Sequence, residues 1–376
     1  MITSLITPKK ILAIKLRALG DTVIMSASLL ALKKAYPNSE IDVLVTNTWA
    51  SLLENHPAVN RIWKYERHKD APSRAKAVAK LALKLRKEKY DCVVNFHASP
   101  SSSALAYALG SKVRSIHFHG HQDKNRYSTV TVPGKGELKP IIERDLDTVR
   151  ALGVLIDEPY TPQIFLNEDE IKEAENRIQV LGLKKPILCL GIGASRSTKS
   201  WPLDRYASIA IRWCEDTNGS VICFNSREEE LQAKSFFNFV DDKLAQWYQD
   251  TQKRKQVRSR IICETQISLR TMSALFKNSS VYLGNDSGPK HIAVASGLSS
   301  VTVFGPEDPF EWHPYPKDKH PIHYIEGLSC RKDHQPGFKP WCGLHECVVE
   351  EHRCMRQIAE DDVYRTVKNL YLKGTQ

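Results

Sequence analysis

The residues best suited to chemistry lie in the run Gly284-Asn285-Asp286-Ser287-Gly288-Pro289-Lys290-His291, which separates an apolar stretch at 281–283 from a helix-like stretch at 292–297. Pro289 suits the first turn of a helix, and Gly288 lets a ligand approach the backbone closely. The start of a helix offers unpaired N–H groups and a positive partial charge, which favour phosphate. The run therefore predicts a nucleotide-diphosphate site. The structural alternative is a capped helix after a buried strand.

A second loop, residues 191–202, places cations and hydroxyl groups beside glycines that permit close backbone approach. Arg196 and Lys199 supply the cations, and Ser195 supplies one of the hydroxyls. These groups suit a diphosphate. The spacing matches neither the P-loop nor G-x-G-x-x-G, so a solvated basic loop is the alternative.

A third loop, residues 16–22, ends the first apolar run of the chain. Gly20 permits a tight turn there. Asp21 either caps the following helix or stands at the mouth of a cleft as a general base.

Strand-like and helix-like segments alternate on both sides of these loops, which indicates parallel sheets with crossover helices. The chain is long enough for two domains. We expect an α/β protein with two Rossmann-like, doubly wound domains facing a cleft, divided into residues 1–158 and 159–376. The final helix, at 361–372, is expected to pack on either half, including a return to the N-terminal one.

The expected strands are 11–16, 41–46, 61–65, 91–96 and 113–118 in the first half, and 187–192, 220–224, 261–263, 281–283 and 300–304 in the second. The expected helices are 22–35, 75–88, 143–152, 203–217, 227–237, 268–277 and 361–372. The polar, basic insertion at 248–260 has no assigned purpose.

The composition is that of a globular protein, with 41% hydrophobic residues and a net charge of +11. The charge favours anionic partners but does not choose among phosphorylated sugars, acidic lipid surfaces and nucleic acid. Residues 1–19 lack both a signal-peptide core and a spanning helix, and no apolar run is long enough to cross a membrane. These features predict a cytoplasmic protein with no transmembrane segment.

Several cysteines crowd into residues 330–354, with histidines between them. Without an export signal they argue against a disulfide framework. They are candidates for a structural zinc or iron site, although the C-x2-C spacing is absent. The alternative is that they are buried or incidental. The members are Cys330, Cys342, Cys347 and Cys354, with His334, His345 and His352 interspersed.

No metal or other cofactor is expected in catalysis. The pair Asp145 and Asp147 has the Asp-x-Asp spacing, but it falls within a helix-like segment rather than in a strand-end loop. We discount it as a magnesium site. Lys199, Arg196 and a helix start can neutralise phosphate charge instead.

Four motifs in order resemble glycosyltransferase family 9, whose best-known members are ADP-heptose:lipopolysaccharide heptosyltransferases. The resemblance covers nearly the whole chain, and the tail is similar to that of heptosyltransferase II-like members. The motifs are Leu19-Gly20-Asp21, Lys199-x-Trp201-Pro202, Gly284-Asn285-Asp286-Ser287-Gly288-Pro289-x-His291, and Phe304-Gly305-Pro306 with Asp308-Pro309.

The resemblance implies a GT-B fold, with the acceptor on the N-terminal half and the sugar nucleotide on the C-terminal half. It implies that Asp21 deprotonates the acceptor hydroxyl and that the anomeric configuration is inverted. The donor would be ADP-heptose, and the acceptor a lipopolysaccharide core on lipid A at the inner membrane surface, with no nucleic acid. The implied donor-site residues are Ser195, Lys199, Asp286, Ser287, Gly288 and His291, with Gly20, Arg196 and Lys290 as secondary candidates.

Asp286 needs a separate account, because a carboxylate facing phosphate would be repelled. We expect it to cap the helix or to accept hydrogen bonds from the sugar. Lys290 departs from the family pattern, in which this position is usually apolar, and Ala194-Ser195 replaces the usual polar run. Some related protein heptosyltransferases carry iron on cysteines.

The helix expected at 75–88 is strongly basic, with Lys76, Lys80, Lys84 and Lys87 along one face. It suits docking to an anionic lipid surface, or it is an ordinary solvated face.

Together these features predict an inverting, cytoplasmic heptosyltransferase, peripheral on the inner membrane. One rival is a transferase of the same family that acts on another glycan or on a protein hydroxyl. Another is a catalytically silent sugar-nucleotide binder. A nicotinamide-dependent oxidoreductase would share the fold, but no glycine fingerprint follows the first strand.

Overall fold

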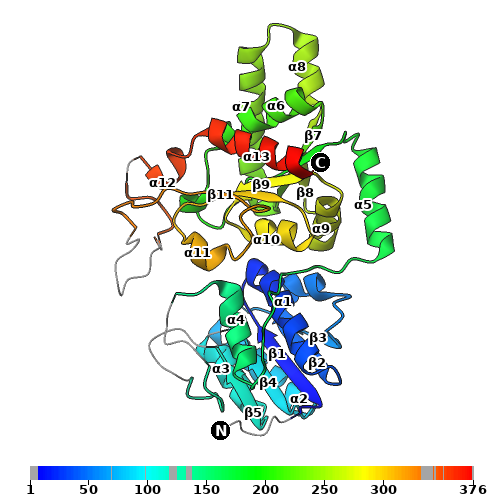
Figure 1. Ribbon diagram of the computed structural model, residues 1–376, viewed down its shortest axis with the longest axis vertical. Helices are drawn as coiled ribbons and strands as arrows, with labels where there is room; N and C mark the ends of the chain where they lie inside the picture. Colours follow the sequence, from blue (N-terminus) through cyan, green and yellow to red (C-terminus); the bar gives the residue numbers. More distant parts are fainter. Residues whose placement is uncertain are drawn as a thin grey trace. The chain divides into compact units, whose positions relative to one another are not determined.

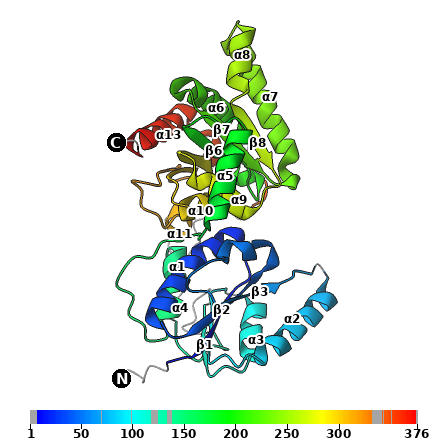
Figure 2. The same cartoon turned by 90° about the vertical axis from the view of Figure 1, so that its right-hand side faces the viewer.

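A computed structural model describes residues 7–68, 70–97, 99–117, 125–132, 138–331, 342, 344–349 and 351–374. The chain forms two compact units, Met1–Phe165 and Leu166–Gln376 (Figures 1 and 2). The division falls later than the expected 158/159, because the connector still contacts the first unit. The backbone N–H of Gln163 donates to Ser26 Oγ at 2.9 Å, and Phe165 packs edge-on against His56.

The first unit is built on a parallel sheet of five strands in the order β3-β2-β1-β4-β5. Its elements are β1 (Lys10–Lys15), α1 (Leu19–Ala35), β2 (Glu40–Thr46), the 3-10 helix η1 (Asn47–Leu53), β3 (Arg61–Tyr65), α2 (Ala71–Arg86), β4 (Cys92–Asn95), α3 (Pro100–Ala108), β5 (Val113–Ile116) and α4 (Ile141–Arg150).

Helices cover both faces of this sheet, as strands buried on both sides require. Leu29 of α1 and Val149 of α4 belong to the core on one face, and Leu85 of α2 and Leu105 of α3 belong to the core on the other. The first unit is therefore doubly wound, as predicted.

The second unit contains a parallel sheet of six strands in the order β11-β10-β9-β6-β7-β8. Its elements are α5 (Glu168–Val180), β6 (Ile187–Gly191), η2 (Ser197–Lys199), α6 (Leu203–Thr217), β7 (Ser220–Asn225), η3 (Arg227–Glu229), α7 (Glu230–Trp247), α8 (Thr251–Arg258), β8 (Ile261–Thr265), α9 (Leu269–Lys277), β9 (Val281–Asn285), α10 (Gly288–Ala295), β10 (Ser300–Val303), α11 (Pro309–Trp312), β11 (Ile322–His323), α12 (Arg353–Arg356) and α13 (Glu360–Gly374).

The final helix, α13, packs within the second unit. Val363, Val367 and Leu370 belong to the same buried cluster as Trp213 of α6, and the Tyr364 hydroxyl donates to the carbonyl of Arg212 at 3.1 Å. Of the two halves on which this helix was expected to pack, it packs on the second. The apolar face of α13 packs against the sheet and against α6 of the second unit.

The basic insertion at 248–260 is largely helical. Asp250 caps α8 by accepting a hydrogen bond from the backbone N–H of Gln252 at 2.8 Å. Val257 is buried in the core of the second unit. The insertion thus packs against α6 and α7 and leaves Lys253 and Lys255 exposed.

Each sheet has a point at which the strand order reverses. In the first unit it lies between β1 and β4, and in the second between β6 and β9. Ligands of open parallel sheets bind outside the carboxyl ends of the strands at such points. The loops after β1, β6 and β9 are therefore where binding groups are to be sought.

Candidate active site

Asp21 lies in the first turn of α1, directly after the loop that follows β1. It is not the N-cap. Its Oδ2 accepts a hydrogen bond from the backbone N–H of Ala18 at 2.8 Å, which closes the start of the helix. Its Oδ1 lies 3.7 Å from Lys15 Nζ, and 21% of its side chain is exposed. Asp21 therefore combines a fixed position with an accessible carboxylate, as a general base requires.

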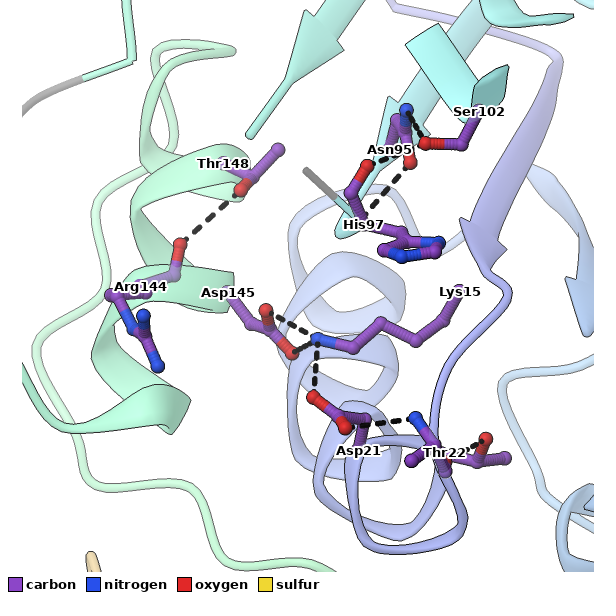
Figure 3. Close-up of polar contacts among 10 residues, drawn as sticks. Lys15, Asp21, Thr22, Asn95, His97, Ser102, Arg144, Asp145 and Thr148 are labelled. Atoms are coloured by element: carbon purple, nitrogen blue, oxygen red, sulfur yellow. Dashed lines mark hydrogen bonds and ion pairs between the residues drawn. The ribbon is translucent and has the colours of Figure 1, made fainter. Parts of the chain in front are cut away.

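Lys15, the last residue of β1, is almost fully buried beside Asp21. Its Nζ lies 2.9 Å from both carboxylate oxygens of Asp145, which comes from α4 (Figure 3). Lys15, Asp21 and Asp145 form what we call the carboxylate-rich cluster. Asp145 lies in a helix, as the sequence predicted. Its ion-pair partner is Lys15.

In the second unit, buried hydrogen bonds fix the loop that carries Lys199. Asn285, at the end of β9, accepts from the backbone N–H of Trp201 and from the Tyr206 hydroxyl, both at 3.0 Å. Its amide donates to the carbonyl of Ile192 at 2.9 Å. Trp201 is fully buried, and its Nε1 donates to the carbonyl of Ile358 at 3.2 Å. These contacts hold the segments Lys199-x-Trp201-Pro202 and Asn285-Asp286 next to each other.

Glycines at the ends of β6 and β9 leave room for the buried side chain of Tyr282, which is itself a residue of β9. Gly191 and Gly284 are register partners. A Cβ at these positions would lie 1.8 Å and 2.3 Å from the Tyr282 hydroxyl oxygen. Only glycine fits there, so the strand ends that carry both binding loops stay in register.

Asp286 is the hub of the second unit's polar site. Its Oδ2 lies 2.7 Å from Lys199 Nζ, and its Oδ1 lies 2.6 Å from Lys290 Nζ. Burial alone would raise the pKa of Asp286, but the two lysines outweigh it and hold the pKa far below its usual range. The expected capping role is wrong, because Ser287 occupies the N-cap of α10.

Lys290 is fully buried, although it occupies a position that is usually apolar in the pattern it departs from. Its Nζ also donates to the carbonyl of Trp312 at 3.0 Å and lies 4.6 Å from the centre of the Phe304 ring. Burial lowers the pKa of Lys290, and Asp286 opposes this change. Its position is set by three partners, which a cation buried at this depth requires.

Arg196 and Glu307 complete the site. The two side chains form an ion pair, and Glu307 Oε1 lies 3.8 Å from Lys199 Nζ. Burial raises the pKa of Glu307, whereas Lys199 and Arg196 lower it. We call this group the cation-rich cluster, which consists of Arg196, Lys199, Lys290, Asp286 and Glu307.

The remaining predicted donor residues differ in accessibility. Ser195 is exposed in the loop after β6. Ser287 and Gly288 are half-buried at the start of α10, and the Ser287 hydroxyl makes no capping hydrogen bond. His291 is buried, and its Nδ1 is 2.5 Å from the Tyr315 hydroxyl. Burial holds the pKa of His291 well below its usual value, so the ring is neutral.

The cysteine-bearing tail contacts the loop that carries Lys199. Ser197 and Thr198 hydroxyls donate to the carbonyls of His345 and Leu344, at 2.7 Å and 2.8 Å. Arg196 donates to the carbonyl of Cys342 at 3.2 Å. The tail therefore supports the loop at 191–202, which carries Lys199. No motif in the sequence predicted this contact.

The four tail cysteines are free thiols. Burial raises the pKa of Cys354 to about 11, and the nearby thiols of Cys347, Cys330 and Cys342 add to this effect. Within the described part of the chain, no three His, Cys, Asp or Glu side chains are arranged to hold a metal ion. His334 of the predicted set lies outside the described residues.

Sequence reasoning missed Lys15 and Glu307, named Asn285 only as part of a motif, and set Asp145 aside. Lys15 carries a signal that could have found it, since a lysine ending an otherwise apolar strand requires a partner. Asp145 offers no such signal, because only the packing of α4 on α1 brings it to Lys15.

These features define an α/β protein of two Rossmann-like units, one with a surplus carboxylate at its switch point and one with surplus cations. The chain belongs to glycosyltransferase family 9 (heptosyltransferase), whose model matches residues 78–341. It is therefore a glycosyltransferase.

Lipopolysaccharide heptosyltransferase 3 of Escherichia coli K12 is 23% identical over 309 residues, which cover 79% of this chain and 82% of that protein. The solved structure of E. coli ADP-heptose lps heptosyltransferase II has the same fold, with a TM-score of 0.74 and 20% identity, over 98% of this chain and 100% of that one.

A more distant fold relative is the iron-containing dodecameric glycosyltransferase TibC from enterotoxigenic E. coli. Its TM-score is 0.57 at 13% identity, with 100% of this chain and 78% of that chain covered.

Proposed function

We propose that this glycosyltransferase moves a heptose from ADP-heptose to the inner core of lipopolysaccharide, with inversion at the anomeric carbon. Membership of the heptosyltransferase family supports the reaction class. The donor and acceptor are those named for its relatives. The observation that carries the proposal is the pairing of an accessible carboxylate after β1 with surplus cations after β6 and β9.

In the proposed reaction, Asp21 accepts the proton of the acceptor hydroxyl as the oxygen attacks the anomeric carbon. The bond between that carbon and the β-phosphate oxygen breaks, and ADP leaves with the bonding electron pair. Negative charge therefore grows on the diphosphate. In this proposal Lys199, supported by Lys290 and Arg196, stabilises that charge in place of a catalytic metal.

The first unit binds the acceptor in this proposal, and the second unit binds the donor. Ser195, Ser287 and Gly288 are reachable from solvent and would contact the diphosphate or sugar. His291 would support the donor site without direct contact to solvent, because its ring is buried against Tyr315. Asp286 would hold Lys199 in place until phosphate replaces it as the partner.

The test is to incubate the protein with ADP-heptose and defined truncated lipopolysaccharide cores and to weigh the products. We expect the mass of one heptose to be added to a heptose-deficient core, together with release of ADP. Transfer to a soluble glycan or protein hydroxyl but not to any core would replace the acceptor assignment. Donor binding without transfer to any acceptor would point to a silent binder.

The proposed site of action is the cytoplasmic face of the inner membrane, where a lipid-anchored acceptor would be met. No helix in the described part of the chain is long and apolar enough to span a membrane. The basic face of α2, with Lys76, Lys80 and Lys84 exposed, supports peripheral docking to anionic lipid. Co-sedimentation with anionic vesicles should fall when these lysines are replaced by glutamine. Salt-insensitive binding would contradict this assignment.

A structural metal, either zinc or iron, is proposed for the four tail cysteines, whose thiols act on one another electrostatically at Cys354. As described, they are not arranged to hold an ion, so the proposal requires the tail to rearrange around the metal. Because the tail contacts the Lys199 loop, metal removal should weaken donor binding without abolishing it. Elemental analysis of the purified protein decides the matter, and a metal-free protein with full donor affinity would refute it.

A further inference from the structure

Lys15 is shared unequally between two carboxylates. Its Nζ lies 2.9 Å from both oxygens of Asp145 but 3.7 Å from Asp21 Oδ1 (Figure 3). Lys15 and Asp145 are buried, whereas Asp21 is partly open to solvent. Asp145 thus holds the lysine next to Asp21 without occupying the accessible position itself.

The strength of Asp21 as a base depends on how much of the Lys15 charge acts on it. An ionised Asp145 neutralises Lys15. A protonated Asp145 would leave the lysine with Asp21 as its one carboxylate partner in this cluster, and an ion-paired carboxylate takes up a proton less readily. The charge of Asp145 is therefore transmitted to Asp21 through Lys15.

Among the described residues, the charged groups that act on Asp145 include Lys15 of β1, Asp21 of α1 and Arg144 of its own helix, α4. His97, which follows β4, is a further titratable group of this site (Figure 3). Burial raises the pKa of Asp145 to about 6, while Lys15 pulls it down. Asp145 therefore changes charge within the range in which an enzyme of this kind operates.

We propose that Asp145 is a positioning residue that, acting through Lys15, sets the strength of Asp21 as the base of the transfer reaction. The inference rests on the proposed function, because it takes Asp21 as the group that accepts the acceptor hydroxyl proton. It adds a fully buried residue to the group that would control the base. No bond changes at Asp145 apart from the gain or loss of its own proton to solvent.

The experiment measures kcat and acceptor KM from pH 5 to 8 for the unaltered enzyme and for Asp145→Asn. Asparagine imitates the protonated acid at every pH. We expect kcat at pH 7.5 to fall roughly tenfold with little change in KM, since a base contributing roughly 100-fold or more is weakened and not removed. The fall in kcat of the unaltered enzyme near pH 6 should be absent from the variant.

A double variant separates this role from a structural one. Combining Lys15→Met with Asp145→Asn removes the unbalanced cation, so kcat should recover to within about threefold of the unaltered enzyme. A merely structural pair predicts a double variant at least as impaired as the single one. Asp147→Asn is the matched control, because Asp147 is also buried on α4 but pairs with Lys139 and Arg150.

Two results would overturn the inference: a pH profile of Asp145→Asn identical to that of the unaltered enzyme, or no recovery in the double variant. If Asp145→Asn does not fold, infrared spectroscopy of the unaltered protein still decides. A buried carboxyl must then lose its proton near pH 6, together with the rise in kcat.

The failure of the proposed function is distinguishable. Full activity of Asp21→Asn would contradict the assignment of Asp21 as the base, and with it the proposed function. An inactive Asp21→Asn together with an unaffected Asp145→Asn would contradict only the role of Asp145.

Discussion

The two units contain charge clusters of opposite sign pattern. In the first, one lysine lies between two carboxylates, with Lys15 beside Asp145 and Asp21. In the second, one carboxylate lies between two lysines, with Asp286 beside Lys199 and Lys290. Both follow the carboxyl ends of strands at the point where the strand order reverses.

The difference lies in which charge is left over. The carboxylate-rich cluster has one more anion than cations, so it can accept a proton from a hydroxyl group. The cation-rich cluster has one more cation than anions, so it can accept a phosphate. In the proposed reaction, this difference in charge balance would suit the first unit to base catalysis and the second to binding the leaving diphosphate.

Burial acts on both clusters, but the number of partners decides the outcome. Asp145 has one lysine, so burial prevails and its pKa rises to about 6. Asp286 has two lysines, which outweigh burial, and its pKa falls far below the usual range. A single buried carboxylate is therefore titratable in one unit and permanently charged in the other.

The largest effect should come from removing the surplus anion. Asp21→Ala is expected to lower kcat roughly 100-fold or more and to spare donor affinity, because a general base is lost. Steady-state kinetics and calorimetric titration with ADP measure the two quantities. Asp21→Asn is the control, since its side-chain oxygen can still accept from Ala18 N–H. Recovery with asparagine would assign the loss to the helix cap.

Removing the surplus cation should act on binding. Lys199→Met is expected to weaken ADP binding roughly 10- to 100-fold, the worth of a hydrogen bond to a charged group. Lys184→Met, an exposed lysine before β6, is the control at the opposite end of the strand. Equal affinities of the two variants for ADP would show that the cation-rich cluster does not hold phosphate.

Lys290→Met tests whether Lys290, by pairing with Asp286, weakens the hold of Asp286 on Lys199. With Lys290 absent, Asp286 would hold Lys199 more strongly, so ADP affinity should fall roughly fivefold, less than in Lys199→Met. The free energy of unfolding should fall by about 3 kcal/mol, since a buried pair is broken. Chemical denaturation and calorimetry provide both values. Unchanged ADP affinity in a folded Lys290→Met protein would restrict the role of Lys290 to stability.

Mild acid should separate the clusters with the smallest perturbation. Between pH 7 and 5, Asp145 should take up a proton, whereas Asp286 should remain ionised. Carboxyl carbon-13 shifts followed by NMR report both groups, and the Asp145→Asn and Asp286→Asn variants assign the signals. Titration of Asp286 in this window would remove the contrast between the units.

The alternation of apolar runs with amphipathic segments was enough to predict two parallel sheets. It missed α3, because Pro100 and the serines that follow it are typical of a loop. The structure shows instead that Ser99 caps this helix by accepting from the backbone N–H of Ser102 at 3.1 Å, with Pro100 in its first turn. Local composition cannot weigh the burial of Leu105, which comes from the core of the fold.

The candidate residues could be located from the sequence for the same reason, although their roles stay predictions. Asp21, Lys199 and Asp286 follow the carboxyl ends of β1, β6 and β9, where open parallel sheets bind ligands. Their partners were not predictable. The Asp-x-Asp pattern of Asp145 did not point to a lysine partner, and the motif around Glu307 did not point to Arg196. Lys290 had no explanation until Asp286, Trp312 and Phe304 were found around it.

The sequence by itself determined the class of fold and the residue types at the strand ends, because hydrophobic periodicity and turn chemistry are local properties. Only the tertiary structure decided which charges meet. Lys15 and Asp145 are 130 positions apart and become a pair only when α4 packs against α1 over the sheet. Burial removes the water that would screen them, and that loss of screening makes their pairing matter for chemistry.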